Sequence, residues 1–164
     1  MASLTIDFYQ DVVCCWCFNI SSRMRKLTSE FDRDIWHHTI VLQASRTEMA
    51  ARGCKAAERI GGQASQWAMF DWLQRAHLTE ARKMAEPEIV LRAARRMGFE
   101  SAAFGEIFDD QATAPAVEED RQRAHALQIS SVPKLIVRET GTRLVNGLLD
   151  DMASQRRSAI QFVG

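Results

Sequence analysis

The sequence lacks a surplus of charge of either sign. Lysine plus arginine and aspartate plus glutamate each number 21, so the formal net charge is zero, and no block of like charge stands out along the chain. Proteins that bind nucleic acid or anionic membranes generally carry a basic patch or stripe. The composition therefore argues against nucleic acid and against a membrane surface as partners.

Long apolar runs are also missing. No stretch approaches the roughly 18 consecutive apolar residues of a membrane-spanning helix, because Asp, His or Arg interrupts every run. The first residues, Met1 to Thr5, carry neither a basic segment nor a small-residue cleavage site, so we expect no secretory signal. These absences favour a cytoplasmic protein, in whose compartment thiols are kept reduced.

The chain does have the composition of an ordinary globular domain, with 164 residues, 46% of them hydrophobic and 26% charged. A chain of this length buries about two-thirds of its unfolded surface, which is enough for a core without disulfides or metals. The four cysteines therefore need another explanation. Closely spaced cysteines in a reducing compartment are more often catalytic or metal-binding than structural.

Apolar periodicity predicts a strand and then a helix near the N-terminus. Leu4, Ile6 and Phe8 alternate with more polar neighbours, which is typical of a strand. The apolar residues that follow recur every three or four positions, as on one face of an amphipathic helix. They are Cys17, Ile20, Met24, Leu27 and Phe31. The segment Cys14–Cys17 therefore falls at a strand-to-helix junction.

The rest of the chain predicts further elements around one sheet. We expect, in chain order, a strand at 35–42, a helical block at 45–128 that includes helices at 87–97 and 117–127, a strand hairpin at 135–145 and a helix at 151–162. Gly61–Gly62 and Gly98 should interrupt the helical block. Because a crossover helix joins the first two strands, these should be parallel, and the hairpin should add antiparallel strands.

The expected fold class is therefore α/β, with a mixed central sheet flanked by helices. Residues 1–44 and 129–164 would form the sheet domain, and 45–128 an all-helical insertion.

Cys14 and Cys17 are separated by two residues, so their sulfur atoms lie one helical turn apart. At a helix N-terminus, unpaired N–H groups and the helix dipole lower the pKa of a thiol from about 8.5 to about 3.5–7.5. Cys14 stands at that position, whereas Cys17 belongs to the buried stripe. Cys14 is therefore the expected nucleophile, and Cys17 is the thiol that would resolve a mixed disulfide.

Other interpretations of these residues stay open. A buried free cysteine is often only a small apolar side chain, which is the alternative for Cys17 taken alone. Cys54 is expected to be a spectator, either packed or exposed. A zinc site would need two ligands besides Cys14 and Cys17, and the sequence has no second close pair of cysteines to supply them. We therefore expect no metal. His37 and His38 point to opposite faces of a strand, so at most one of them faces the cysteines. Asp7, Asp11 and His37 are unranked candidates for proton transfer.

The segment from Ile6 to Tyr9 with Asp11-Val12-Val13-Cys14-Cys15-Trp16-Cys17 resembles the first strand and active-site helix of the DsbA family in the thioredoxin superfamily, particularly its FrnE-like branch. The similarity covers nearly the whole chain and is weakest at 43–69. Its other parts are 72–80 and 86–99, which resemble the helical insertion of that branch, 124–137, which resembles the approach to the Val-Pro loop, and 141–147, which resembles the terminal hairpin.

The resemblance implies a thioredoxin fold with a helical insertion, and a thiol-disulfide oxidoreductase that acts on protein or small-molecule thiols. Cys14 would be the nucleophile and Cys17 the resolving cysteine of a redox-active disulfide. Pro133 would be the family's cis-proline, and Val132 and Trp16 would join it in binding an extended substrate. No resident cofactor is implied. Glutathione or a cellular reductase would be the electron partner, and a homodimer stays open.

One position departs from the family, which usually has proline where this chain has Cys15. The change frees a backbone N–H near Cys14 and removes a fixed φ angle. Cys15 also adds a third thiol, about 100° around the helix from Cys14, which we expect to be open to glutathione capping or dimer formation. We expect Cys15 to modulate the reactivity of the Cys14–Cys17 pair, and His37 is a second candidate modulator.

Two other functions compete with the oxidoreductase. One is a glutathione-dependent isomerase or transferase of the kappa-class type, whose members typically lack the second cysteine. The other is a non-catalytic thioredoxin-like binding module. Disulfide exchange needs Cys14 and Cys17, the isomerase needs only the Cys14 position, and the module needs neither.

Overall fold

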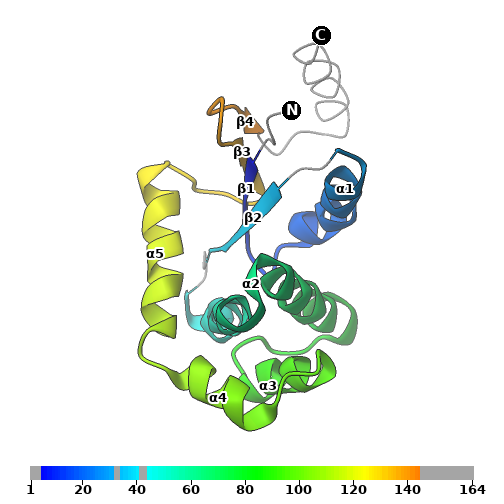
Figure 1. Cartoon of the computed structure of the whole chain (residues 1–164), viewed down its shortest axis with the longest axis vertical. Helices are drawn as coiled ribbons and strands as arrows, with labels where there is room; N and C mark the ends of the chain where they lie inside the picture. The colour runs from blue at the N-terminus through cyan, green and yellow to red at the C-terminus, as the bar shows by residue number, and fades with distance from the viewer. Residues whose placement is uncertain (1–4, 32–33, 41–43, 145–164) are drawn as a thin grey trace.

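The computed structural model describes residues 5–31, 34–40 and 44–144. Its centre is a four-stranded sheet in the order β2-β1-β3-β4 (Figure 1). The strands are β1 (Thr5–Gln10), β2 (Asp34–Thr39), β3 (Lys134–Val137) and β4 (Arg143–Leu144). β1 runs parallel to β2 and antiparallel to β3, and β3 pairs antiparallel with β4. The predicted α/β class, with a mixed sheet in a thioredoxin-type arrangement, is confirmed.

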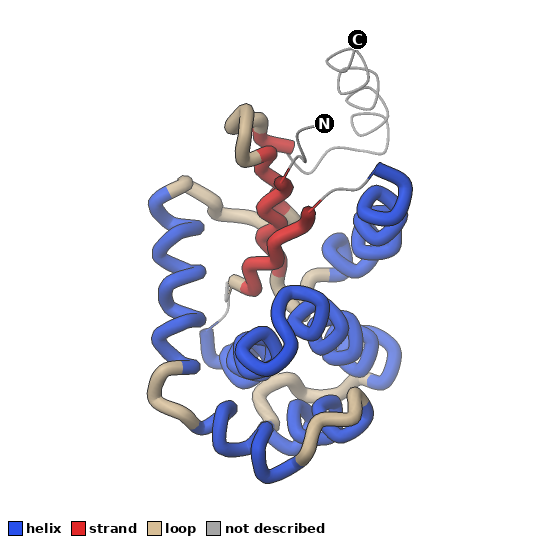
Figure 2. Tube along the Cα trace, viewed as in Figure 1, coloured by secondary structure: helices blue, strands red, loops and turns tan. Residues whose placement is uncertain are grey.

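Helices surround the strands, as Figure 2 shows. They are α1 (Cys15–Phe31), α2 (Ala44–Glu80), α3 (Pro87–Arg96), α4 (Ser101–Asp109) and α5 (Thr113–Ala126). α1 and α5 lie on opposite sides of the sheet, and α2 to α4 gather at one end of it (Figure 1). No helix in the described ranges is long and apolar enough to cross a membrane. The division into a sheet domain and an insertion stays a prediction.

The two largest buried clusters among the described residues join the sheet to the helices. The smaller one joins the sheet to α1 and to the second half of α2, and consists of Ile6, Phe8, Met24, Ile35, Trp67 and Leu135. The larger one runs from the end of β1 through α2, α3 and α4, and it includes both Cys17 and Cys54. Cys17 and Met24, two members of the predicted stripe, are completely buried, as the helical period requires.

The predicted strand at 35–42 is shorter where the structure describes it, because β2 is Asp34–Thr39 and Ile40 lies beyond its end, while 41 and 42 lie outside the described residues. Its partner β1 ends at Gln10, where the chain turns toward α1. The N–H of Ile40 donates to the carbonyl of Gln10 at 2.8 Å, and this is the last rung that β1 offers. β-favouring residues alone therefore do not extend a strand beyond its pairing partner.

The helical block is confirmed, with one boundary corrected. α2 is bent at Gly61 and Gly62, where Gly62 has a φ of +70° that favours glycine. α5 begins at Thr113 and not near 117. Pro115 lies in its first turn, where a missing N–H removes no intrahelical hydrogen bond. The predicted closing helix at 151–162, and Val145 of the hairpin, lie outside the described residues.

Candidate active site

Cys14 occupies the position immediately before α1. Its carbonyl accepts the first hydrogen bond of the helix, from the N–H of Phe18 at 3.2 Å, and its own N–H donates to the carbonyl of Asp11 at 3.0 Å. These two bonds fix the turn between β1 and α1. The sulfur of Cys14 accepts the N–H of Cys17 at 3.2 Å, so it fills the role that a capping oxygen has in other helices.

These contacts favour the thiolate form of Cys14. A hydrogen bond from the Cys17 side chain lowers its pKa most, burial opposes this, and the N–H groups of Cys17 and Trp16 lower it further, so that the pKa is about 7. Asp11, nearly completely buried nearby, partly offsets the effect by its negative charge. Near neutral pH a large fraction of Cys14 is therefore nucleophilic.

Cys17 has the opposite environment on the same helical turn. Its side chain is completely buried, and burial together with the neighbouring Cys14 raises its thiol pKa far above the usual range. Cys54 is also buried, which raises its pKa to about 12. All four cysteines are free thiols in this structure. The turn thus holds one ionisable, partly exposed sulfur beside one protonated, buried sulfur.

The predicted substrate-binding residues lie around Cys14. The Cys14 thiol is 3.6 Å from the carbonyl oxygen of Val132, to which it donates when protonated. The peptide bond between Val132 and Pro133 is cis, the isomer that the resemblance implies. Trp16 is 62% exposed beside the thiol, and Cys15 is exposed as expected. The side chain of His37 lies outside the described part of the chain, so its predicted role stays a prediction.

One contact of Cys14 was not found from the sequence. The side-chain amide of Gln74, on the second half of α2, donates to the Cys14 carbonyl at 2.9 Å. Gln74 is completely buried, and in the sequence it follows Trp72, which packs against the large cluster, and Leu73, which belongs to that cluster. A glutamine in an apolar stretch can be noticed in the sequence as an unusual residue. The sequence does not show that its hydrogen-bond partner is Cys14, which lies sixty positions earlier.

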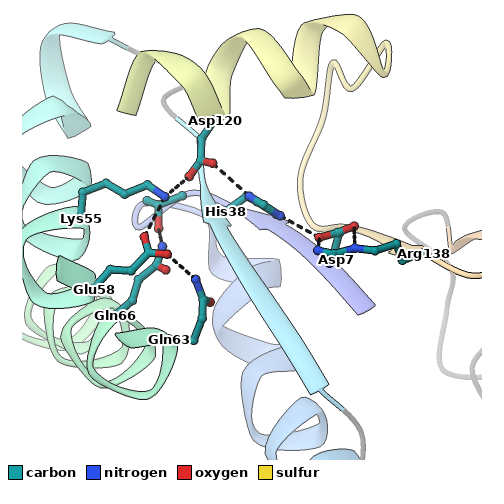
Figure 3. A network of polar contacts seen from close by, with 9 residues as sticks. Asp7, His38, Lys55, Glu58, Gln63, Gln66, Asp120 and Arg138 are labelled. Atoms are coloured by element: carbon teal, nitrogen blue, oxygen red, sulfur yellow. Dashed lines mark hydrogen bonds and ion pairs between the residues drawn. The ribbon is translucent and has the colours of Figure 1, made fainter. Parts of the chain in front are cut away.

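A second group of polar residues lies on the face of the sheet that α5 covers (Figure 3). The two ring nitrogens of His38 lie 2.8 Å from Asp7 and 3.0 Å from Asp120. Asp120 also pairs with Lys55 at 2.7 Å, and Asp7 with Arg138 at 2.6 Å. Both ring nitrogens of His38 are therefore held in contacts with carboxylates of this network. Asp7, a candidate for proton transfer, is bound within this network, whereas Asp11 lies beside the cysteines.

Comparison with known proteins identifies the class. A model of the DSBA-like thioredoxin domain matches residues 36–155, which is most of the chain. The chain therefore belongs to the DSBA-like thioredoxin domain family. The matched range begins after Cys14, Cys15 and Cys17, so this assignment does not depend on the motif itself. A comparison with curated protein sequences gives no significant match. The FrnE-like branch stays a prediction.

Solved structures share the fold across nearly the whole chain. A Nitrosomonas europaea protein with a provisional assignment as a disulfide isomerase has a TM-score of 0.83 at 16% identity, covering 99% of this chain and 100% of its own. The cytosolic disulfide reductase DsbM from Pseudomonas aeruginosa, with glutathione, has 0.77 at 17%, covering 96% and 100%. A 2-hydroxychromene-2-carboxylate isomerase has 0.74 at 14%, covering 97% and 95%. At these identities the likeness concerns the fold, which hosts more than one reaction.

Proposed function

We propose that the protein is a thiol-disulfide oxidoreductase that exchanges a Cys14–Cys17 dithiol and disulfide with protein or small-molecule thiols. The observation that carries the proposal is the unequal pair at the start of α1. The Cys14 sulfur is partly exposed and accepts the Cys17 N–H, with a thiol pKa of about 7, while Cys17 is buried and protonated. An attacking thiol is most effective when its pKa lies near the ambient pH.

The reaction in the reducing direction follows from this pair. The Cys14 thiolate attacks one sulfur of a substrate disulfide, so a Cys14–substrate bond forms, the substrate S–S bond breaks and a substrate thiolate leaves. Cys17 then gives up its proton to that leaving thiolate or to solvent and attacks Cys14. The Cys14–Cys17 bond forms and the second substrate thiolate departs. The substrate gains two electrons and the enzyme loses two, and every step is reversible.

Glutathione is the co-substrate that we propose for returning the pair to its dithiol form. Two glutathione molecules would reduce the disulfide and leave as one glutathione disulfide. DsbM, which shares the fold, is a cytosolic disulfide reductase that has been solved with glutathione. This supports a cytoplasmic location as part of the proposal, because the reducing glutathione pool there can drive the recycling step.

Redox equilibration tests the proposal directly. The protein is incubated in glutathione buffers of graded ratio, its thiols are trapped by alkylation, and the cysteine pairs are mapped by mass spectrometry. We expect one reversible Cys14–Cys17 couple, abolished by Cys14→Ser and by Cys17→Ser. Cys15→Ser is the matched control, since it removes a thiol from the same helical turn and should leave the couple in place. The midpoint potential of the Cys14–Cys17 couple then shows whether the protein acts mainly as an oxidant or as a reductant.

Two results would overturn the proposal. If the Cys17→Ser variant keeps its activity with glutathione while Cys14→Ser loses it, the glutathione-dependent isomerase is favoured, because that reaction needs only the Cys14 position. If neither cysteine pairs in any buffer, the dithiol mechanism fails outright, and the binding module becomes the better interpretation.

A further inference from the structure

The Cys14 carbonyl has two donors, and only one of them belongs to its own helix. The first is the N–H of Phe18, which every helix supplies to its capping residue. The second is the Gln74 amide at 2.9 Å, which comes from α2. Because only the NH2 end of a glutamine can donate to a carbonyl, the orientation of the Gln74 side chain is fixed by this contact.

Gln74 is an unfavourable residue for simple packing at this place. Its side chain is completely buried, and within the described part of the chain its Oε1 atom has no hydrogen-bond partner. A buried polar atom without a partner destabilises a fold, and an apolar side chain of similar shape would avoid that penalty. A leucine would fill the same space among the neighbouring apolar residues. The amide is therefore poorly explained by stability alone.

Gln74 is also not needed to attach α1 to α2. Asp71, one turn earlier on α2, accepts the hydroxyl of Ser21 at 2.9 Å and pairs with Arg25. Trp67 donates its ring N–H to Ser21 at 3.2 Å. These contacts hold the first half of α1, whereas the Gln74 bond reaches Cys14, the residue just before the helix begins. The distinctive effect of Gln74 is therefore local to Cys14.

We propose that Gln74 is a positioning residue for Cys14: its amide holds the Cys14 carbonyl, and with it the peptide plane at the start of α1, so that the sulfur stays aligned with the N–H groups of Trp16 and Cys17. This inference rests on the proposed function, because it assigns Gln74 to the same thiol. Without the amide, that peptide can rotate and the two donors align less well with the sulfur. The thiolate then loses part of its stabilisation.

The test compares Gln74→Leu with Gln66→Leu. Gln66 is a matched control on the same helix: it is equally buried, its Oε1 also has no partner among the described residues, and its amide faces Thr39 at 3.5 Å and not Cys14. Both variants are made in the Cys15→Ser background, and the Cys14 thiolate is titrated by its ultraviolet absorbance. Stability is measured in parallel by urea unfolding.

We expect Gln74→Leu to raise the titration midpoint by roughly half a pH unit, about a threefold loss of thiolate below the midpoint, with unfolding stability equal to or above that of the parent. Gln66→Leu should leave the midpoint unchanged. The Cys14–Cys17 couple of Gln74→Leu should also reach half-oxidation in a more reducing buffer, because its reduced form has lost thiolate stabilisation. A purely structural Gln74 would change stability without moving the midpoint.

A measurement on the unsubstituted protein keeps the test decisive if Gln74→Leu does not fold. The side-chain NH2 resonances of Gln74 should shift with the Cys14 titration, and those of Gln66 should not. If the parent shows a Cys14–Cys17 couple but Gln74 responds neither way, the positioning role is wrong while the oxidoreductase stands. If the parent shows no couple, the proposed function fails by itself.

Discussion

Cys14 and Cys17 share one helical turn, yet their sulfurs have opposite protonation behaviour. The cause is the direction of each side chain, since Cys14 faces the start of the helix and Cys17 faces the core. Hydrogen bonds lower the pKa of the first thiol, and desolvation raises that of the second. Two cysteines at this spacing therefore differ strongly in how readily they ionise, without any additional base.

The lowered pKa of Cys14 can be measured by titration. In the Cys15→Ser variant, thiolate absorbance should rise with a midpoint near pH 7, because the pKa of Cys14 is about 7 while those of Cys17 and Cys54 are raised. The lowered pKa also means that Cys14 stabilises the reduced fold above the ordinary thiol pKa of about 8.5, and that this contribution is lost as the pH falls through 7. Adding Cys14→Ser should abolish the transition.

The hydrogen bond from the Cys17 side chain is tested by two further substitutions. A serine at this position keeps a donor beside Cys14, whereas an alanine keeps only the backbone N–H. We expect Cys17→Ala to move the Cys14 midpoint upward, toward the ordinary value of about 8.5, and Cys17→Ser to move it less. Equal midpoints in the two variants would show that the backbone donors and not the side chain set the pKa.

Both ends of α3 are set by residues next to them in the sequence. Pro87 occupies its first position, and Gly98 follows its last turn with a φ of +84°. The N–H of Phe99 donates to the carbonyl of Ala94 at 3.0 Å, the bond that closes a helix ending in a left-handed residue. Sequence predicted this helix well because both end signals depend only on neighbouring residues.

A pair of glycine substitutions checks that interpretation. Gly98→Ala should lower the free energy of unfolding by about 1–2 kcal/mol, because an L-residue with a Cβ is strained in the left-handed region. Gly105 lies inside α4 with nothing near the place of a Cβ, so Gly105→Ala should raise stability by about 1 kcal/mol through helix propensity. Urea unfolding measures both. Equal effects of the two substitutions would contradict the assigned helix end.

Features that depend on neighbouring residues could be predicted from the sequence, whereas contacts between distant segments could not. The place of Cys14 before α1 follows from strand alternation and helical period within about thirty residues. The end of β2 at Thr39 depends on where β1 stops, and the bond from Gln74 to Cys14 depends on how two distant helices pack. His38 has no local signal that would place it between Asp7 and Asp120. Such contacts are set by tertiary structure.

A chain of charged residues joins the sheet to the helices that cover it (Figure 3). Arg138 and Asp7 come from the β3 end and β1, His38 from β2, Asp120 from α5 and Lys55 from α2. Asp120, His38 and Lys55 are buried. Removing one partner from a buried ion pair leaves an uncompensated charge, whereas an exposed pair contributes little. This network therefore ties α2 and α5 to the sheet.

Asp120→Asn tests that role. Burial alone would raise the pKa of Asp120, but the hydrogen bond from His38 and the charge of Lys55 outweigh it, and the pKa lies below the ordinary carboxyl value. A lowered folded pKa gives stability that is complete above the unfolded pKa of about 3.9 and is lost as the pH falls through the folded value. We expect Asp120→Asn to cost about 3–5 kcal/mol at neutral pH, with the difference from the parent shrinking below about pH 4.

The control is Glu118→Gln on the same helix, which breaks the exposed pair of Glu118 with Arg121. Because solvent screens that pair, its loss should change stability by less than about 1 kcal/mol at any pH. Urea unfolding of the three proteins over a pH series separates the two cases. If Asp120→Asn and Glu118→Gln give the same small change, the buried charges do not hold α5 to the sheet, and apolar packing around Val117 and Ala124 would have to account for its position.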